Sequence, residues 1–390
     1  WLKWLAFSLV GAGWTVWLQT EFRWSTEIFL RHAPRALREL DVDGVLVDES
    51  RCGGGTVAEH LGLPFVTVST TLPWSGEPTL PPIFTGWDCT DGRTARLRNR
   101  MAYAGWNWYM RPVLKVLNRY RRDWGLRRFT QISDTHSPLA HLGQSCAEFD
   151  FPRRDLPETF HYVGALSAVR AGGSHAFPWQ KLDGRPLIFA SLGTVSDGAN
   201  RPVYPKIAEA CAGLDAQLVM TLGRWNDTHF ATCEEMGDLP GNPVMVDFAP
   251  QLELLDRAAL LITHAGMNTT LESLCRGVPM VAMPRSGDQP AVAARIERAG
   301  VGLRAPFHGG TAADVRRIVQ QVLTEERFRL RARELQQRLA AAGGVRRAAD
   351  IVEEAVSTRR PVKRESSETR PRFTAGPPPA STSAMLAKER

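Results

Sequence analysis

The sequence predicts an α/β protein of two domains, each built on a parallel β-sheet. The second half alternates short apolar runs with helix-like stretches, as expected for buried strands that are covered by helices on both faces. The first half shows one strand–helix–strand unit of the same kind. The length of 390 residues, with 43% hydrophobic and 23% charged residues, suits two globular cores.

In the first half, two apolar runs rich in Val flank a short helix-like stretch and make one βαβ unit. Two parallel strands do not form a self-sufficient sheet, and the chain begins with Trp1. We therefore expect an incomplete N-terminal domain over residues 1–166, belonging to a longer protein. The expected elements are strands at 44–48 and 65–69 and helices at 25–40, 54–61 and 93–127.

The second half reads as a complete α/β domain over residues 186–356, joined to the first by a Gly-rich linker at 167–185. Residues 312–356 are expected to form two basic helices that close this domain. The tail, residues 357–390, is basic and rich in Pro, Ser and Thr, so we expect it to be disordered. The expected strands are 186–191, 217–222, 244–248, 259–263 and 278–283, and the helices between them are 203–213, 252–256, 268–276 and 290–299.

Composition narrows the class of protein. The six cysteines are scattered without a CxxC pair, which argues against a disulfide framework or a zinc site and favours a cytoplasmic location. The apolar segment 4–18 is shorter than the roughly 20 residues that span a bilayer, so we expect it to pack in a core or to lie on a membrane surface. The net charge of +7 resides largely in the tail, which we interpret as solvated. No base-reading motif is present, and no nucleic-acid partner is expected.

Segment 96–128 interleaves basic side chains with Trp106, Trp108, Tyr109 and Trp124. Such a helix suits a lipid interface, which would allow peripheral membrane contact. The alternative is a surface helix whose aromatic side packs on its own domain. The residues alone leave both interpretations open.

The densest chemical signal lies in residues 247–289. The strand at 259–263 ends at His264, a tight turn through Gly266 follows, and a helix begins near Asn268 and Thr269. This order directs free backbone N–H groups and the positive end of a helix dipole at one point, which predicts an anion site. His264 could donate a hydrogen bond to a phosphate oxygen, and Gly266 would allow close approach of the backbone.

Further elements are expected at the same site. The loop with Ser191, Gly193 and Thr194 follows the first strand of this domain and could supply donors to a diphosphate. Glu272, one turn into the helix, could accept hydrogen bonds from ribose hydroxyls. The pair Asp288 and Gln289 suits recognition of sugar hydroxyls. Each element alone also fits a structural role, for instance as a helix cap; their order and spacing together favour a nucleotide-sugar site.

Residues 247–289 resemble the donor-binding signature of the family 1 glycosyltransferases. Phe248-Ala249-Pro250-Gln251 resembles that family's W-x-P-Q, with Phe for Trp, and residues 264–269 resemble its H-x-G-x-N-[ST]. Glu272, residues 277–279 and Asp288-Gln289 stand where the family has E, G-x-P and a closing D-Q. Residues 53–68, 77–87 and 162–164 resemble in particular the bacterial zeaxanthin glucosyltransferase-like enzymes; macrolide glycosyltransferases are also similar.

The resemblance implies a GT-B fold, in which two Rossmann-like domains face a cleft, and a role for each matching residue. Phe248 would stack on the base, Gln251 and Glu272 would contact the nucleoside, and Asp288 and Gln289 would contact the hexose. The diphosphate would be held by His264, Asn268 and Thr269 without a metal or other cofactor. The closing D-Q favours glucose, so UDP-glucose is the expected donor.

The same resemblance implies an inverting mechanism, in which a histidine deprotonates the acceptor hydroxyl and an aspartate orients that histidine. Asp48, at the end of the strand at 44–48, matches the aspartate; a helix-cap or turn role is its alternative. The histidine would lie upstream of this sequence, since His32 and His60 have the wrong context. No residue is assigned as the base.

Three functions are compatible with these residues. The first is transfer of a hexose from a UDP-sugar to a hydroxyl of a lipophilic small molecule, such as a carotenoid or another natural product. The second is a truncated or degenerate homologue that binds UDP-sugar without turnover or assists a partner. The third is a sugar-nucleotide epimerase of the same fold, which the closing D-Q disfavours. We expect a cytoplasmic protein, in peripheral contact with a membrane if the acceptor is lipophilic.

Overall fold

The computed structural model describes residues 2–166, 177–193, 200–223 and 233–364, with backbone alone for 2–18. It contains two parallel sheets, which confirms the predicted fold class. One sheet has the strand order β1-β2-β3-β4, and the other has β10-β9-β8-β5-β6-β7. Every strand pair in both sheets is parallel. Thr194 and most of the predicted linker lie outside the described residues.

The N-terminal domain contains the predicted βαβ unit and two further strands that were not predicted. The missed strands, β3 and β4, have three residues each, too few to show an apolar pattern. The single helix expected at 93–127 is two helices that meet at Met110, where Pro112 falls in the first turn of the second helix. The elements are α1 (Leu2–Glu39), β1 (Val45–Asp48), α2 (Gly54–Leu61), β2 (Phe65–Ser69), α3 (Arg93–Tyr109), α4 (Arg111–Asp123), β3 (His141–Gly143) and β4 (Phe160–Tyr162).

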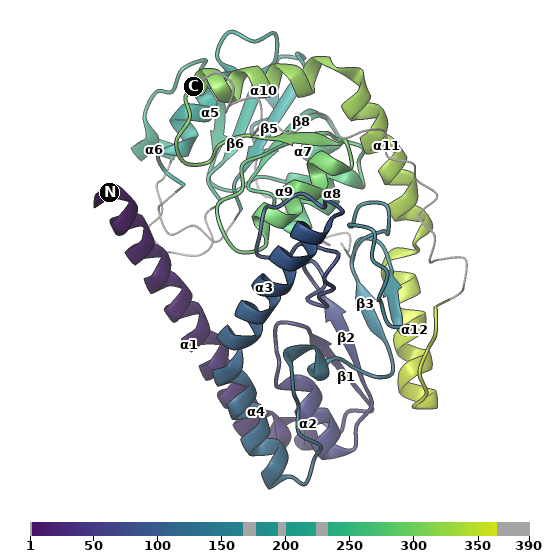
Figure 1. Cartoon of the computed structure of the whole chain (residues 1–390). Coiled ribbons are helices and arrows are strands. Elements are labelled where there is room, and N and C mark those ends of the chain that lie inside the picture. The colour runs from purple at the N-terminus through teal and green to yellow at the C-terminus, as the bar shows by residue number, and fades with distance from the viewer. Residues whose placement is uncertain (1, 167–176, 194–199, 224–232, 365–390) are drawn as a thin grey trace.

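The second domain has its six strands at the centre and helices on both faces (Figure 1). Two separate apolar clusters cover the two faces of the sheet, as the doubly buried strands predict. Its strands are β5 (Leu187–Ser191), β6 (Gln217–Thr221), β7 (Val244–Val246), β8 (Ala258–Thr263), β9 (Met280–Ala282) and β10 (Gly302–Arg304). Its helices are α5 (Val203–Cys211), α6 (Cys233–Met236), α7 (Gln251–Leu255), α8 (Met267–Leu274), α9 (Gln289–Arg298), α10 (Ala312–Thr324) and α11 (Glu326–Ala341).

The last helix, α12 (Gly344–Thr358), returns to the N-terminal sheet (Figure 1). Its buried Ile351 packs in one cluster with Val66 and Leu142. After the helix, the backbone N–H of Val362 donates to the carbonyl of Leu139. Residues 344–364 therefore pack on the first domain, whereas we predicted that residues 344–356 belong to the second. Residues 357–364 are ordered, which corrects that part of the predicted disordered tail; residues 365–390 lie outside the described part.

The packing of α12 leads to a prediction about stability. Ile351→Val removes one buried methylene and is expected to lower the free energy of unfolding by about 1 kcal/mol, within the range seen for this change in cores. Val345→Ala on the same helix, where the side chain is 50% exposed, should have a much smaller effect. Urea unfolding measures both. Equal losses for the two variants would contradict the docking of α12 on the sheet.

The two domains meet where the strands of both sheets end. Leu72, which follows β2, and Cys146 and Phe149, which follow β3, are buried in the core cluster of the second domain. Behind this contact, Arg295 of α9 donates to Asp150 at 2.7 Å, and both side chains are 1% exposed. The carboxyl ends of the parallel strands thus face one another, the usual place for a ligand in open α/β sheets. Within the described residues, every helix is too short or too polar to cross a membrane.

Candidate active site

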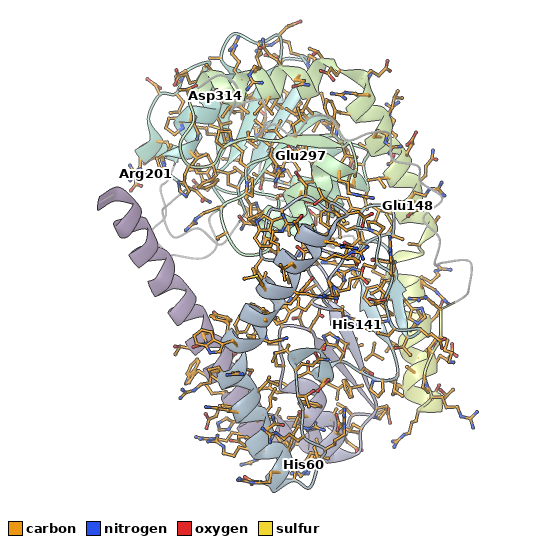
Figure 2. All side chains as sticks on the ribbon, in the orientation of Figure 1. His60, His141, Glu148, Arg201, Glu297 and Asp314 are labelled. Carbon is orange, nitrogen blue, oxygen red and sulfur yellow. The ribbon has the colours of Figure 1, made fainter. Side chains whose placement is uncertain are left out.

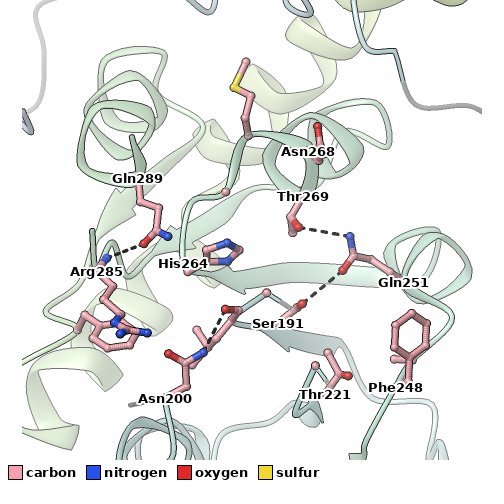
Figure 3. Close-up of a pocket in the computed structure, with 17 residues that line it drawn as sticks. Ser191, Asn200, Thr221, Phe248, Gln251, His264, Asn268, Thr269, Arg285 and Gln289 are labelled. Carbon is pink, nitrogen blue, oxygen red and sulfur yellow. Dashed lines mark hydrogen bonds between the residues drawn. The ribbon is translucent and has the colours of Figure 1, made fainter. Parts of the chain in front are cut away.

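A cavity of about 320 Å³ opens at the carboxyl ends of β5, β6 and β8 (Figure 3). Of the twelve predicted donor-site residues, nine line it: Ser191, Gly193, Phe248, Gln251, His264, Gly266, Asn268, Thr269 and Gln289. Four elements far apart in the sequence thus converge on one space. Thr194 lies outside the described residues, and Glu272 and Asp288 are not among the residues that line the cavity.

His264 lies between two glycines at the centre of the cavity. A Cβ on Gly193 would stand 2.8 Å from its Cε1 atom, and a Cβ on Gly266 would stand 2.4 Å from its Nε2 atom. Only glycine fits at either position while the ring stays in place. Burial lowers the pKa of His264 to about 4, against a smaller opposing effect of a hydrogen bond with the Ser191 backbone. The imidazole is therefore neutral near pH 7 and offers one N–H donor.

Helix α8 begins at the cavity, with Gly266 as its N-cap residue. Asn268 and Thr269 occupy its first turn and line the cavity. Ala265, just before the cap, has a left-handed backbone (φ 65°) although it is not glycine, and its side chain is fully buried. Such strain at a turn is held only by the surrounding packing. The turn presents the unpaired N–H groups of the helix to the cavity, which suits an anion.

Gln251 connects three parts of the cavity wall, as Figure 3 shows. Its Oε1 accepts from the Ser191 hydroxyl at 3.3 Å, and its Nε2 approaches the Thr269 hydroxyl at 3.5 Å. The same Nε2 donates to the carboxylate of Glu272, which is 4% exposed. Glu272, predicted to contact ribose, therefore holds Gln251 from behind the cavity wall. Phe248 lines the cavity beside Gln251, where a base could stack.

Asp288 and Gln289, the pair predicted to recognise the sugar, lie at the start of α9 in different surroundings. Gln289 lines the cavity, and its Oε1 accepts from the backbone N–H groups of Arg285 and Ser286. Asp288 is the N-cap residue, and its side chain makes no capping hydrogen bond. Burial raises the pKa of Asp288, and its Oδ2 atom is buried without a hydrogen-bond partner in the described part of the chain. A buried carboxylate oxygen of this kind suits a ligand hydroxyl.

Several lining residues were missed by the sequence reading. Asn200 donates to the Leu192 carbonyl at 3.3 Å, Thr221 ends β6, and Arg285 follows β9. Among the described lining residues, Arg285 is the one that brings a positive charge to the cavity. The rule that ligands bind at strand carboxyl ends could have identified both, since Thr221 lies near the end of the predicted strand 217–222 and Arg285 follows the predicted strand 278–283.

Asp48, the predicted catalytic aspartate, lies at the carboxyl end of β1 and outside the cavity lining. Its carboxylate accepts from the Ser50 N–H at 2.8 Å and from the Thr70 hydroxyl at 2.5 Å. The Ser50 hydroxyl also donates to it. No histidine contacts Asp48 in the part of the chain that the structure describes.

A buried cluster of Glu49, His136 and His141 lies next to Asp48; Figure 2 marks His141. Glu49 Oε1 lies 2.9 Å from Nε2 of His136 and accepts from the Trp74 N–H, and Oε2 accepts from Ser69. Their ligand atoms all lie within 4.8 Å of one another, close enough to hold a metal ion. The hydrogen bonds from Ser69 and Trp74 to Glu49 also fix the loop that follows β2.

Two histidines with lowered pKa values make stability depend on pH. Burial lowers the pKa of both His264 and His141 to about 4, from about 6.5 in an unfolded chain. The unfolded chain therefore binds protons first, so the free energy of unfolding should fall as the pH drops from 6.5 to 4. The slope is at most about 1.4 kcal/mol per pH unit for each histidine. Urea unfolding between pH 4 and 8 checks this, and His264→Gln should make the fall less steep; a flat profile would contradict it.

The two parallel sheets, with a cavity at the carboxyl ends of the strands, resemble solved structures of glycosyltransferases. The glycosyltransferase of kitacinnamycin superposes with a TM-score of 0.68 at 24% identity over 86% of this chain and 82% of that one. CalG4, the calicheamicin glycosyltransferase, gives a TM-score of 0.67 at 21% identity over 88% and 83%. The fold is thus that of GT-B glycosyltransferases.

Sequence relatives identify the family. Residues 107–337 match the model of the UDP-glucoronosyl and UDP-glucosyl transferases. The chain is 36% identical to zeaxanthin glucosyltransferase of Pantoea ananas over 88% of its own length and 79% of the relative's. The zeaxanthin glucosyltransferase of Pseudescherichia vulneris is 35% identical over 85% and 78%. The chain belongs to the UDP-glycosyltransferase family, enzymes that transfer sugar from UDP-sugars to small molecules.

Proposed function

We propose that this chain is an inverting glycosyltransferase that binds UDP-glucose and transfers the glucose to a hydroxyl of a lipophilic small molecule such as a carotenoid. The observation that carries the proposal is the convergence of His264, Gln251 and the first turn of α8 on one cavity. The relatives named zeaxanthin glucosyltransferase support an acceptor of this kind.

In the proposed complex, the diphosphate lies at the start of α8. Asn268, Thr269 and the neutral imidazole of His264 donate hydrogen bonds to it, and the helix dipole stabilises the negative charge that grows as the glucose leaves. Gln251 and Phe248 hold the nucleoside. Gln289 binds glucose hydroxyls, and so does Asp288, whose Oδ2 has no hydrogen-bond partner among the described residues.

On the acceptor side, we propose that Asp48 orients the base that deprotonates the acceptor hydroxyl. The two faces of the cleft then supply different parts of the reaction, with donor residues in the second domain and Asp48 in the first. We also propose that the protein acts in the cytoplasm at a membrane surface. A groove along α4, lined by Arg111, Lys115, Arg119, Arg122 and Arg128, is basic enough to contact anionic lipid.

A second candidate function is UDP-sugar binding without turnover. The hydrogen bonds of Asp48 favour this second candidate. Its carboxylate accepts from Ser50 and Thr70, and no histidine among the described residues donates to it. An assay of UDP release from UDP-glucose, with and without a hydroxylated carotenoid, separates the two. Acceptor-dependent release that Asp48→Asn reduces supports the transferase. A chain that binds UDP but releases none from UDP-glucose, with or without the acceptor, supports the second candidate.

A further inference from the structure

Gln144 connects the two halves of the site through one side-chain amide. It directly follows β3 of the first domain and is 5% exposed. Its Nε2 donates to the carbonyl of Thr70 in the first domain and, at 2.9 Å, to Oδ1 of Asn268 in the second. Since Asn268 stands at the start of α8, a residue outside the donor signature reaches the proposed diphosphate position.

The contact with Thr70 determines which way both amides face. A backbone carbonyl only accepts hydrogen bonds, so the group of Gln144 that faces it must be the NH₂ group. The same NH₂ group faces Asn268, which must therefore present its Oδ1 to Gln144. The NH₂ group of Asn268 is then left on the other side. Asn268 is exposed and lines the cavity, so this second NH₂ group is available to a ligand there.

An anion needs donors, and the reverse orientation of Asn268 would set an oxygen against it. The hydrogen bond from Gln144 thus selects the orientation in which Asn268 can bind a diphosphate. The anchor of this bond, Thr70, also donates its hydroxyl to Asp48 at 2.5 Å. One chain of hydrogen bonds therefore joins Asp48, Thr70, Gln144 and Asn268 across the cleft.

We propose that Gln144 is a positioning residue for the nucleotide diphosphate, which acts by fixing the amide of Asn268 with its NH₂ group toward the cavity. The proposal rests on the proposed donor site, and it adds an interdomain residue to that site. It also explains how contact between the two domains prepares the diphosphate position.

Calorimetric titration of the chain with UDP tests this proposal. Gln144→Met has a similar length and no donor, and it is expected to raise the dissociation constant of UDP about tenfold, the lower end of what the loss of a hydrogen bond to a charged ligand costs. Gln144→Glu, which offers only acceptors, should raise it further. The KM for the UDP-sugar should rise by the same factor. In an Asn268→Ala background, Gln144→Met should change the constant less than about twofold, because the cycle isolates the pair.

Controls distinguish this role from a structural one. Gln217→Met removes a similar amide at the far end of β6, where it donates to the Lys181 carbonyl, and should leave UDP binding unchanged. Equal effects of Gln144→Met with and without Asn268 would overturn the proposal. If the Gln144 variants do not fold, Asn268→Asp and Asn268→Ala test the orientation of the Asn268 amide directly. The proposal is overturned if these two variants bind UDP with equal affinity. No binding of UDP by the unaltered chain would instead remove the donor site itself, and the role of Gln144 with it.

Discussion

Replacing Asp150 by asparagine is expected to lower the free energy of unfolding by about 3–5 kcal/mol, the usual cost of leaving buried charge uncompensated. Asp150 accepts from Arg295 of the second domain at 2.7 Å and from Arg153 at 2.6 Å. Tyr162 donates to it at 2.8 Å. Asparagine would leave two buried guanidinium groups facing a neutral amide, at the point where the two domains are held together.

The electrostatics of Asp150 support this size of effect. Burial alone would raise its pKa, but the charges of Arg153 and Arg295 outweigh burial and hold the pKa well below the usual range. A carboxylate with a lowered pKa in the folded state stabilises the protein fully above its unfolded pKa of about 4, and this contribution falls as the pH drops further. Burial lowers the pKa of Arg295, and its Nη2 has no hydrogen-bond partner among the described residues. Its other contacts, with the Ala291 carbonyl and the Phe151 ring, carry no full negative charge that could replace Asp150.

Urea unfolding at pH 7 measures the effect of Asp150→Asn. Asp183→Asn is a matched control, because Asp183 pairs with Arg185 on the surface and its loss should barely change stability. A loss below about 1 kcal/mol for Asp150→Asn, similar to that of a surface pair, would show that the interdomain contact does not depend on this ion pair.

Gly266→Ala is expected to weaken UDP binding at least about tenfold, as the loss of one hydrogen bond to a charged group would. The backbone of Gly266 is extended (φ −66°, ψ 137°), which alanine adopts freely, so backbone strain does not enter. The added Cβ would instead stand 2.4 Å from Nε2 of His264 and force the imidazole out of its position. Overpacking of this kind also costs about 1–3 kcal/mol of stability.

Titration with UDP measures the effect, and Gly105→Ala provides the control. Gly105 lies inside α3, and a Cβ there meets no atom within 4 Å. That change should leave UDP binding unaltered and stabilise the helix by about 0.5–1 kcal/mol. Unchanged UDP affinity in Gly266→Ala would show that the position of the His264 ring is not needed for binding.

The fold was predictable where the local sequence carries the information. Strands β5, β6 and β8 are apolar runs long enough to recognise, and their parallel arrangement follows from the helices between them. The three-residue strands β3 and β4 carry too little signal. The docking of α12 was not predictable either, because an amphipathic helix does not encode which of two sheets it will cover.

The site was predictable where it is contiguous in sequence. His264, Gly266, Asn268 and Thr269 lie on one turn, so a motif captures them together. Arg285 follows a different strand, β9, so no single motif contains it together with these residues, and only the general rule for strand ends points to it. Gln144 comes from the other domain altogether, and its role depends on how the two domains meet.

Thermal denaturation with and without UDP, UDP-glucose and ADP tests the donor site most directly. A ligand that binds only the folded state adds about 2.7 kcal/mol at 100 times its dissociation constant, enough for a clear shift of the melting temperature. We expect UDP and UDP-glucose to raise the melting temperature, ADP to leave it nearly unchanged, and His264→Ala to lose the shift. A cooperative transition that no nucleotide moves, or a shift that His264→Ala retains in full, would contradict the proposed donor site.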